Sequence, residues 1–560
     1  MIEIDREITQ DFARAIGLEW LETNGLGGWA GTTVAGAHSR RCHGLLVAAT
    51  EPPARRTVLL SKLDETLHVG GESFELSCNQ FPGAIVPRGF EHLTAFRKDL
   101  FPVFELEAGG VRLRKTVAAV DGESTTLVLY EVVEAPGPFI LSLRPFLAAR
   151  DQDALASANP GISQETPFEN GILRLRPYEQ VPEIFLQVPG ADFRANPQWW
   201  YRFEYEVDRR RGLDFQEDLW TPGIFGRELK AGDRLGIVIS TQDPAGRDAF
   251  ALLEKERKRR EKILKAMDTR LGVQDDFARS LALAADGFLV RRGAGQRAVI
   301  AGYPRTEERS RDALIALPGL CLVTGRHEDA KKILRAFARS LHQGLLPDRL
   351  PAKGEEPEYT SVDASLWLFV AAWKYLQATG DEAFVRETLL PALRKVVRGI
   401  ETGEDGLLAE GSEVNALWLN ALLILADFEA RLGDPEEAKQ LTQRVKRAQK
   451  SLPEASPSPG QIFALSLPFP VMPKAKAAQL LAAIEETLPA ELLGPYLTAL
   501  VRVHGAAGRK KALAAVEALK PRETFEAEAW SVAEVLRAYV EDVRGGGTGE
   551  AKKSRARKSS

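Results

Sequence analysis

The chain has 560 residues, of which 44% are hydrophobic and 27% are charged, and its formal net charge is -4 at pH 7. This length predicts two or three domains, and the composition is ordinary for a globular protein. The small net charge gives no reason to expect a nucleic-acid partner or an anionic membrane surface.

Several function classes are excluded by what the sequence lacks. Three widely spaced cysteines, Cys42, Cys78 and Cys321, predict neither a disulfide framework nor a cysteine-type zinc site. Seven scattered histidines and the absence of a Walker-type loop predict no metal and no cofactor. The N-terminal MIEIDREITQ does not resemble a signal peptide, and the longest apolar run, Ala416–Phe428, is too short to span a bilayer. We therefore expect a soluble, cytoplasmic protein.

The first part of the chain, to about Thr241, consists of short alternating segments rich in β-branched residues and separated by Gly and Pro. TVLLSKLDETLHVGGESFEL, VRLRKTVAAV, TTLVLYEVVEA and FILSLRPFLA each predict a strand or a hairpin. Many strands at short spacing without intervening helices favour an antiparallel sandwich, which we assign to residues 1–248.

A charged connector follows at residues 249–274. Within it, ALLEKERKRREKILKAM (Ala251–Met267) places Leu, Ile and Met at helical spacing among basic residues. This pattern predicts a helix between the two halves of the chain with its charges in solvent. An exposed helical face explains the basic run better than a nucleic-acid site does.

The period becomes helical from residue 275 to residue 543. Roughly twelve candidate helices follow one another, and Gly often ends one helix shortly before Asp or Pro starts the next, as in ATGDEAF and RLGDPEEA. Repeated helical hairpins suit a solenoid or a closed toroid, and the lack of a fixed-period repeat favours the toroid. The Gly-rich and then basic residues 544–560 predict a disordered tail.

The stretch Trp20–Ala49 is dense in Gly and then in Arg, His and apolar residues. Its Asn24-Gly25 and Gly27-Gly28 pairs predict tight turns. Arg41 and His43 precede an apolar strand directly. They either support a domain boundary or belong to a loop, with Asn24, that reaches a substrate cleft.

This stretch resembles the N-terminal motif of the bacterial and archaeal glycogen debranching enzymes of the amylo-α-1,6-glucosidase type. TNGLGG is followed by RRCHGLL, with Cys42 where the family has Tyr. The likeness continues in six further blocks in the same order. They are Trp199–Phe225, Ala301–Arg326, Tyr359–Phe369, Glu413–Leu422, Gln461–Pro470 and Glu528–Tyr539.

The resemblance implies a fold and a ligand. The family fold is an antiparallel β-supersandwich followed by an (α/α)6 toroid of the six-hairpin glycosidase type, with α-glucan or maltooligosaccharide bound in the mouth of the toroid. It implies an ancestral amylo-α-1,6-glucosidase activity and no cofactor. It does not predict an oligomeric state.

The block YPRTEERSRDALIALPGL carries the sugar pocket in the family, where it resembles Gly-Tyr-Pro-Trp-Phe-x-Asp-Trp-Gly-Arg-Asp. Arg311 and Asp312 match the final Arg-Asp, but residues 305–310 have replaced the Trp-Phe-x-Asp-Trp-Gly portion. Two interpretations remain open. In the first, Arg311 and Asp312 bind sugar hydroxyls. In the second, Ser310 caps a helix and Asp312 stabilises the first turn of that helix.

Two catalytic segments of the family have no counterpart here. Residues 403–418 run from a Gly-Leu-Leu turn directly into EVNALW, without the insert that supplies the proposed general acid, and the segment thought to supply the base is also missing. Inverting hydrolysis needs two carboxyl groups about 6.5–9.5 Å apart. Asp363, Glu413, Glu526 and Glu528 are candidate carboxylates, but none matches a catalytic position of the family.

Further candidate sugar contacts come from the helical blocks. Asp363 and Trp367 are four residues apart on one helical face, although a helix-capping region and a core Trp explain them equally well. Glu413, Asn415 and Trp530 complete the set of candidate substrate-binding residues that begins with Arg311 and Asp312. Trp418 is a further candidate pocket aromatic. The sequence thus favours a family member that binds glucan with reduced or lost hydrolysis, and the alternatives are an active hydrolase and a scaffold without a sugar site.

Overall fold

The computed structural model describes residues 2–293, 295–304, 308–351, 355–451, 456–518 and 527–545. The chain forms two compact units. The first extends through Lys262 and also includes Val290–Gly293, and the second contains most of the remaining residues. The predicted tail is described only at residues 544 and 545, so residues 546–560 lie outside the described residues.

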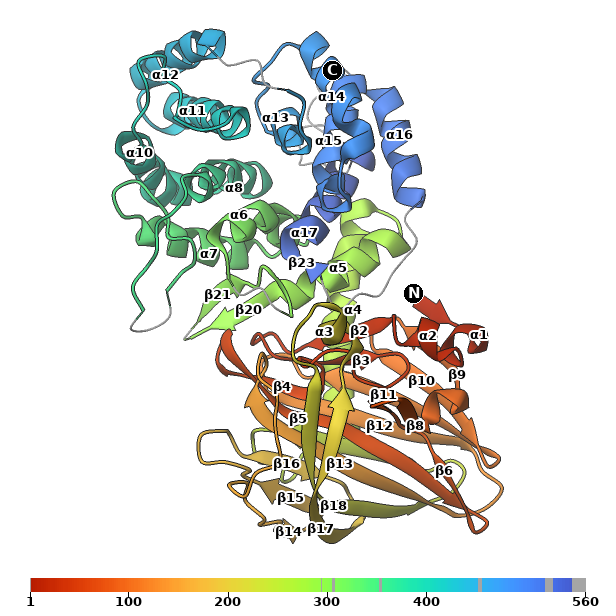
Figure 1. Cartoon of the computed structure of the whole chain (residues 1–560). Coiled ribbons are helices and arrows are strands. Elements are labelled where there is room, and N and C mark those ends of the chain that lie inside the picture. The colour runs from red at the N-terminus through yellow and green to blue at the C-terminus, as the bar shows by residue number, and fades with distance from the viewer. Residues whose placement is uncertain are drawn as a thin grey trace. The chain divides into compact units, whose positions relative to one another are not determined.

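The first unit is built on two antiparallel sheets (Figure 1). Among the described residues, the larger sheet has nine strands in the order β1-β9-β10-β11-β12-β19-β16-β15-β14. Its strands are β1 (Ile2–Ile4), β9 (Leu93–Lys98), β10 (Pro102–Ala108), β11 (Val111–Ala119), β12 (Thr125–Glu134), β14 (Phe168–Glu169), β15 (Ile172–Leu175), β16 (Ile184–Gln187) and β19 (Arg234–Ser240).

The second sheet follows the order β17-β18-β13-β5-β4-β3-β2, with β6 paired to β5. Its strands are β2 (Glu19–Thr23), β3 (Trp29–Thr33), β4 (Gly44–Glu51), β5 (Ala54–Val69), β6 (Glu72–Glu75), β13 (Phe139–Asp151), β17 (Asp192–Glu204) and β18 (Gln216–Leu229). A separate pair, β7 (Cys78–Phe81) and β8 (Ala84–Arg88), and the short helices α1 (Arg6–Thr9), α2 (Phe12–Ala15) and α3 (Glu206–Arg210) complete the unit. The predicted strand segments are all confirmed.

One hydrophobic core joins the two sheets. Leu46, Leu60 and Leu141 of the second sheet share a cluster of buried side chains with Val117 and Val128 of the first. Burying large aliphatic side chains stabilises a fold by about 1.5–3 kcal/mol each. The core therefore lies between two antiparallel layers, as the alternating pattern predicts.

Helix α4 (Ala249–Leu271) is the predicted connector, and the compact units divide within it, after Lys262. The prediction that its charges are solvated is wrong at two positions. Glu256 and Arg260 are only 4% and 8% exposed, and Arg260 Nη2 lies 2.7 Å from Glu22 Oε2. A buried partner on a distant strand cannot be read from the charge pattern of the helix itself.

The second unit is helical. Its helices are α5 (Asp276–Phe288), α6 (Ser310–Leu317), α7 (His327–Ser340), α8 (Asp363–Thr379), α9 (Glu382–Phe384), α10 (Leu390–Gly399), α11 (Ser412–Leu432), α12 (Pro435–Ala448), α13 (Ile462–Ser466), α14 (Lys474–Ile484), α15 (Leu493–His504), α16 (Ala506–Glu517) and α17 (Ala529–Ala538). Short strands accompany them at β20 (Leu289–Arg292), β21 (Gln296–Val299), β22 (Gly302–Tyr303) and β23 (Ala527–Glu528), and β22 pairs with β23.

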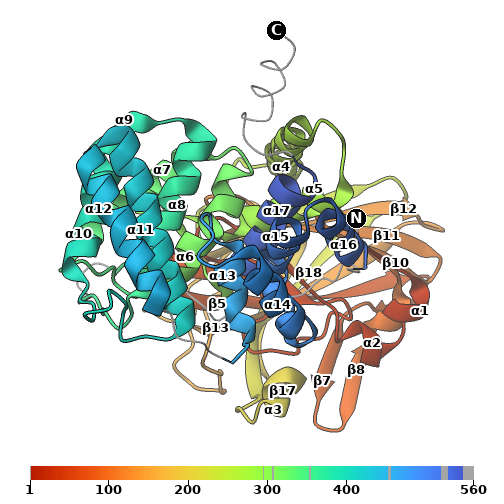
Figure 2. The same cartoon turned by 90° about the horizontal axis from the view of Figure 1, so that it is seen from above.

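Six of these helices form a closed circuit of contacts. Helix α6 contacts α8, α8 contacts α11, α11 contacts α13, α13 contacts α15, α15 contacts α17, and α17 returns to α6. Figure 2 shows α7, α8, α11 and α12 side by side in this unit, with α13, α15 and α17 next along the circuit. The intervening helices, such as α12 against α11 and α16 against α15, pack outside the circuit as hairpin partners.

The circuit closes where α6 ends. Pro318 lacks the N–H that a continuing α-helix requires, and the chain turns into a π-helical segment at Pro318–Leu322. A Cβ on Gly319 would lie 1.9 Å from the carbonyl oxygen of Ala533 in α17. Only Gly therefore permits α17 to pack against the segment after α6 at this distance.

Candidate functional site

Contacts between helix N-terminal ends define the candidate site of the helical unit. Arg311 lies in the first turn of α6, and its Nε lies 2.8 Å from Oδ2 of Asp363, the first residue of α8. Arg311 Nη1 lies 3.3 Å from Oδ1 of Asp312. One guanidinium thus holds two carboxylates from neighbouring helices of the circuit. We call these three side chains the Arg311 cluster.

Three aromatic rings connect further N-terminal ends of the same circuit. The ring centroids of Trp367 in α8 and Phe463 in α13 are 5.3 Å apart at 77°, and those of Phe463 and Trp530 in α17 are 6.3 Å apart at 50°. Trp367 and Trp530 are 8% and 9% exposed, whereas Phe463 is half-buried between them. The sequence analysis identified both tryptophans but missed Phe463, although it lies within the family-like QIFALSLPFP block.

The N-terminal end of α11 also belongs to this region, through hydrogen bonds to the segment before α13. Ser458 Oγ donates to Glu413 Oε1 at 2.7 Å, and Gln461 Nε2 donates to Ser412 Oγ at 3.1 Å. The amide of Asn415 is 2% exposed and binds backbone groups of the preceding turn, including the N–H of Leu408 at 2.8 Å. Glu413 and Asn415 are thus engaged in joining loops to helices.

The structure tests one part of the capping interpretation of the Arg311–Asp312 pair, and the sugar contact stays a prediction. Arg309 occupies the N-cap of α6 and makes no side-chain cap, while Ser310 is the first helical residue, so the prediction of Ser310 as N-cap is wrong. Asp312 accepts its hydrogen bond from Arg311 rather than from a backbone N–H of the helix. Arg311 therefore joins α6 to α8, while Asp312 lies in the first turn of α6 as expected.

Burial shifts the pKa of the Asp312 carboxyl. Its side chain is 11% exposed, and desolvation raises the pKa of this carboxyl above its ordinary value. The neighbouring carboxylate of Asp363 acts in the same direction, whereas Arg311 and Arg309 oppose the shift. The carboxyl of Asp312 therefore keeps its proton to a higher pH than an exposed Asp does.

The other candidate carboxylates lie around the same helix ends. Glu528 is exposed at the N-cap of α17, next to Trp530, and Glu526 lies outside the described residues. Trp418 is fully buried, and its Nε1 donates to the carbonyl of Gly406 at 3.1 Å. Because no ligand can reach its ring in this structure, the prediction of Trp418 as a pocket aromatic is wrong.

The remaining predicted site residues belong to the β-sheet unit. Asn24 is 3% exposed, and its Oδ1 accepts hydrogen bonds from the backbone N–H of Leu26 and of Gly28 at 2.9 and 3.1 Å. A Cβ on Gly28 would lie 2.4 Å from the carbonyl oxygen of Val47. The Asn-Gly and Gly-Gly pairs thus form the predicted tight turn and hold it against β4.

Arg41 is fixed by several acceptors of its own unit. Its backbone N–H donates to Asp208 Oδ2 at 2.7 Å, and its guanidinium donates to the carbonyl oxygens of Asp153, at 2.7 Å, and Asp214. These contacts join the segment between β3 and β4 to the loops around α3. They support the interpretation of Arg41 as a structural residue.

His43 lies in a buried ionic group. Its side chain is fully buried, its Nε2 lies 3.2 Å from Glu19 Oε1, and Arg40 Nε lies 2.6 Å from the same oxygen. Burial lowers the pKa of His43 despite the neighbouring Glu19, so the ring is neutral near pH 7. This environment makes His43 a partner of Glu19 and Arg40 within the fold.

Within the described residues, no group of three or more His, Cys, Asp or Glu side chains could hold a metal ion. No helix in the described part of the chain combines the length and the apolar character that a bilayer crossing requires. The cytoplasmic location stays a prediction.

Both units contain a segment that matches a known protein family. Residues 18–235 match the family described as "Glycogen debranching enzyme N terminal", and residues 283–456 match "Amylo-alpha-1,6-glucosidase". The glycogen debranching enzyme of Saccharomyces cerevisiae is 31% identical over 136 residues, which are 22% of this chain and 8% of the yeast protein.

A solved structure shares the fold over nearly the whole length. A bacterial glucoamylase complexed with acarbose superposes with a TM-score of 0.57 at 11% sequence identity, over 94% of each chain. The two matched segments cover most of the chain and follow the order expected from the motifs. This chain belongs to the glycogen debranching enzyme family.

Proposed function

We propose that the helical unit binds the non-reducing glucosyl end of an α-glucan or maltooligosaccharide at the Arg311 cluster and does not hydrolyse it efficiently. The single observation that carries this proposal is the position of Arg311 between Asp312 and Asp363 at adjoining helix N-terminal ends. A sugar presents hydroxyl groups to such charged donors and acceptors. The family of the chain supports glucan as the ligand.

The aromatic group supplies the second half of a sugar site. Trp367, Phe463 and Trp530 join three helices that also belong to the circuit of Arg311 and Asp363. The apolar face of a sugar ring packs on such rings, while its hydroxyls reach charged groups at the edge. The 41% exposed side chain of Arg311 is accessible to a ligand.

We propose a finer description of the fold on the same basis. The closed circuit of six helices with outer partners supports an (α/α)6 toroid of the six-hairpin glycosidase type, and the two packed sheets support a β-supersandwich. The glucoamylase likeness over both units supports this assignment. Residues 1–248 would form the supersandwich, residues 249–274 the connector, and residues 275–543 the toroid.

We infer the loss of turnover from the contacts of the Asp312 and Asp363 carboxylates. An inverting glycosidase needs one protonated carboxyl at the leaving oxygen and one free carboxylate that activates water. Here Asp312 and Asp363 share one guanidinium, so each is held in an ion pair rather than facing open space. Glu413 accepts a hydrogen bond from Ser458 and contributes to a loop contact instead.

The proposal predicts a saturable response to maltooligosaccharide. Titrating maltotetraose while recording tryptophan fluorescence should change the emission of Trp367 and Trp530, because the rings lie in the proposed site. Arg311→Ala should weaken binding about tenfold or more, since hydrogen bonds to charged groups contribute about 1.5–3 kcal/mol.

Arg386→Ala is the matched control. Arg386 is 55% exposed in the same unit and lies 3.9 Å from Glu382, remote in sequence from the cluster. Affinity should be unchanged in this variant. A flat titration of the unmodified protein would favour a scaffold without a sugar site, and equal affinity in Arg311→Ala would contradict the assignment of the cluster.

The proposal also predicts no release of glucose from limit dextrin above the buffer control. If glucose is released, the unmodified protein is a hydrolase, and Asp312→Asn should then remove the activity, because Asp312 is the buried carboxyl with the raised pKa. Measuring free glucose at pH 5 and pH 7 would separate the two cases. Turnover that survives Asp312→Asn would place catalysis on another carboxylate.

A further inference from the structure

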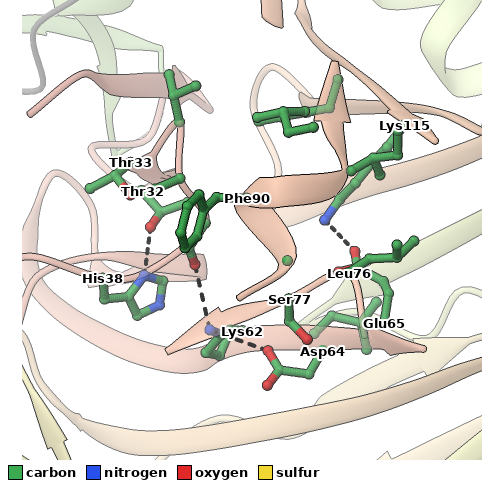
Figure 3. A pocket seen from close by; sticks show the side chains of 18 of the residues that line it. Thr32, Thr33, His38, Lys62, Asp64, Glu65, Leu76, Ser77, Phe90 and Lys115 are labelled. Atoms are coloured by element: carbon green, nitrogen blue, oxygen red, sulfur yellow. Dashed lines mark hydrogen bonds and ion pairs between the residues drawn. The ribbon is translucent and has the colours of Figure 1, made fainter. Parts of the chain in front are cut away.

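A cavity with polar and apolar walls lies in the β-sheet unit, which does not contain the Arg311 cluster (Figure 3). Its volume is about 70 Å³, and side chains of both sheets line it, including Trp20 of β2, Thr32 of β3, Phe104 of β10 and Lys115 of β11. A single water needs about 10–15 Å³ by this measure, so the cavity holds about five waters or one small molecule.

Charged side chains in the wall are largely paired. Lys62 Nζ donates to the carbonyl of Cys78 at 2.7 Å and to Asn79 Oδ1, and it lies 3.2 Å from Asp64 Oδ1. The Lys62 and Asp64 side chains are 7% and 12% exposed. Figure 3 shows both side chains at the wall, with the Lys62 ammonium facing the Asp64 carboxylate.

Glu65 and Lys115 form the opposite charged pair of the wall. Lys115 Nζ contacts Glu65 Oε1, and Tyr130 donates to the same oxygen at 2.8 Å. The side chains of Lys115 and Glu65 are 16% and 5% exposed. Two lysines and two carboxylates therefore leave the lining close to electrically neutral.

His38 adds a neutral polar group. Its Nδ1 lies 2.6 Å from Thr32 Oγ1, and its Nε2 lies 3.0 Å from the carbonyl oxygen of Ser61. Burial and the charge of Lys62 hold the pKa of His38 well below its ordinary value. The ring therefore adds hydrogen-bonding capacity without charge.

One polar group at the cavity remains unused within the described part of the chain. Trp20 is 1% exposed, and its indole Nε1 has no hydrogen-bond partner there. The side chain of Ser77 also lines the cavity. A buried indole N–H without a partner costs free energy, and an acceptor inside the cavity would recover it.

We propose that this cavity binds one small uncharged polyhydroxyl molecule, such as a polyol or a single monosaccharide. The neutral lining disfavours an anion beside Asp64 and Glu65 and a cation beside Lys62 and Lys115. Hydroxyl groups both donate and accept, so they match the indole N–H, the Ser77 hydroxyl and the carboxylate edges. Apolar side chains such as Phe104 and Leu106 face the carbon skeleton.

Calorimetric titration of D-glucose tests the site in the full chain carrying Arg311→Ala, which weakens binding at the proposed helical site about tenfold or more. We expect one glucose per chain. Ser77→Leu should weaken binding at least tenfold, because the larger side chain occupies the cavity. Trp20→Phe keeps an aromatic ring, smaller than the indole, and removes the N–H donor, so it should weaken binding about two- to tenfold.

Ser157→Leu is the matched control, since Ser157 is exposed in the same unit and does not line the cavity. Its affinity for glucose should equal that of the parent, and circular dichroism should verify that each variant is folded. No glucose binding, or binding that both Ser77→Leu and Trp20→Phe leave unchanged, would overturn the proposal. Saturable binding of inorganic phosphate without glucose binding would assign an anion site instead.

Discussion

Replacing Arg537 with Met is expected to lower the free energy of unfolding by about 3–5 kcal/mol, the cost of removing one partner from a buried ionic group. Arg537 of α17 has a side chain that is 5% exposed. It donates to both carboxylate oxygens of Glu534, at 2.8 and 2.7 Å, to Thr498 of α15 at 2.9 Å, and to Asp542 at 3.1 Å. Met fills a similar space but leaves these acceptors buried.

The consequence extends around the helix circuit. Glu541, which lies 3.5 Å from Arg537, also pairs with Lys374 of α8 at 2.7 Å. Without Arg537, three carboxylates retain one close lysine, and like charges in a poorly solvated region repel strongly. The contacts that hold α17 against α15, and the following segment Tyr539–Val543 against α8, should weaken together.

Urea unfolding followed by circular dichroism at 222 nm measures the effect. Arg431→Met is the control, because Arg431 is 53% exposed and pairs with Asp427 at 2.8 Å on the same helix. An exposed pair of this kind contributes about 1 kcal/mol or less. Equal urea midpoints for the two variants would contradict a stabilising role for the buried group.

Much of the architecture could be predicted because it depends on local patterns. The two strand-like parts of residues 57–76 form β5 and β6, which pair directly as a hairpin. Helical periods separated by Gly and Asp predicted a run of roughly twelve helices in the part of the chain that contains α5 to α17. Alternation and helical spacing are properties of short segments, so distant contacts are not needed to see them.

The parts that could not be predicted depend on distant partners. Arg260 was expected in solvent and is buried beside Glu22, which lies 238 positions earlier in the chain. Ser310 was expected at the N-cap of α6 and is instead the first helical residue. Arg309, whose backbone is extended, occupies the N-cap. Phe463 joins Trp367 and Trp530 only through the closure of the helix circuit.

The candidate site could be predicted only in part, because its contacts also join residues that are distant in the sequence. The pairing of Arg311 with Asp363 requires the first turns of α6 and α8 to adjoin, which a motif within one helix does not specify. Arg41 and His43 were assigned to either a boundary or a cleft. Their buried partners support the structural alternative, since a charged group in the interior needs compensation.

The buried group of Glu19, Arg40 and His43 makes the stability of the β-sheet unit dependent on pH. Burial raises the pKa of Glu19, but hydrogen bonds from His43 and Arg40 and the charge of Arg40 outweigh it and lower the pKa to about 2. Because the folded carboxyl has the lower pKa, the unfolded chain binds more protons between pH 4.5 and pH 2. Stability should therefore fall as the pH falls through this range, by about 3 kcal/mol in total.

The two buried histidines extend this trend to higher pH. Burial lowers the pKa of both His38 and His43, so the unfolded chain binds protons below about pH 6.5 that the folded chain does not. Each such histidine lowers the stability by up to about 1.4 kcal/mol per pH unit until its folded-state pKa is reached. The unfolding free energy should decrease steadily from pH 7 towards acid.

Glu19→Gln separates the carboxylate from the histidines. At pH 7 the variant should be less stable by about 3–5 kcal/mol, because Arg40 remains buried without its charged partner. This difference should shrink as the pH falls from 4.5 towards 2, since protonation removes the same charge from the unmodified protein. Urea midpoints at pH 7, 5 and 3.5 provide the measurement.

Glu134→Gln provides the comparison at an exposed position. The Glu134 side chain is 63% exposed and pairs with Arg112 at 2.7 Å, so its replacement should change the stability by less than about 1 kcal/mol at each pH. If the gap between Glu19→Gln and the unmodified protein stays constant from pH 7 to pH 3.5, Glu19 has the same pKa in the folded and the unfolded chain, and its cost is one of packing. A gap that closes in acid identifies the ionised carboxylate as the group that holds Arg40 and His43 in the interior.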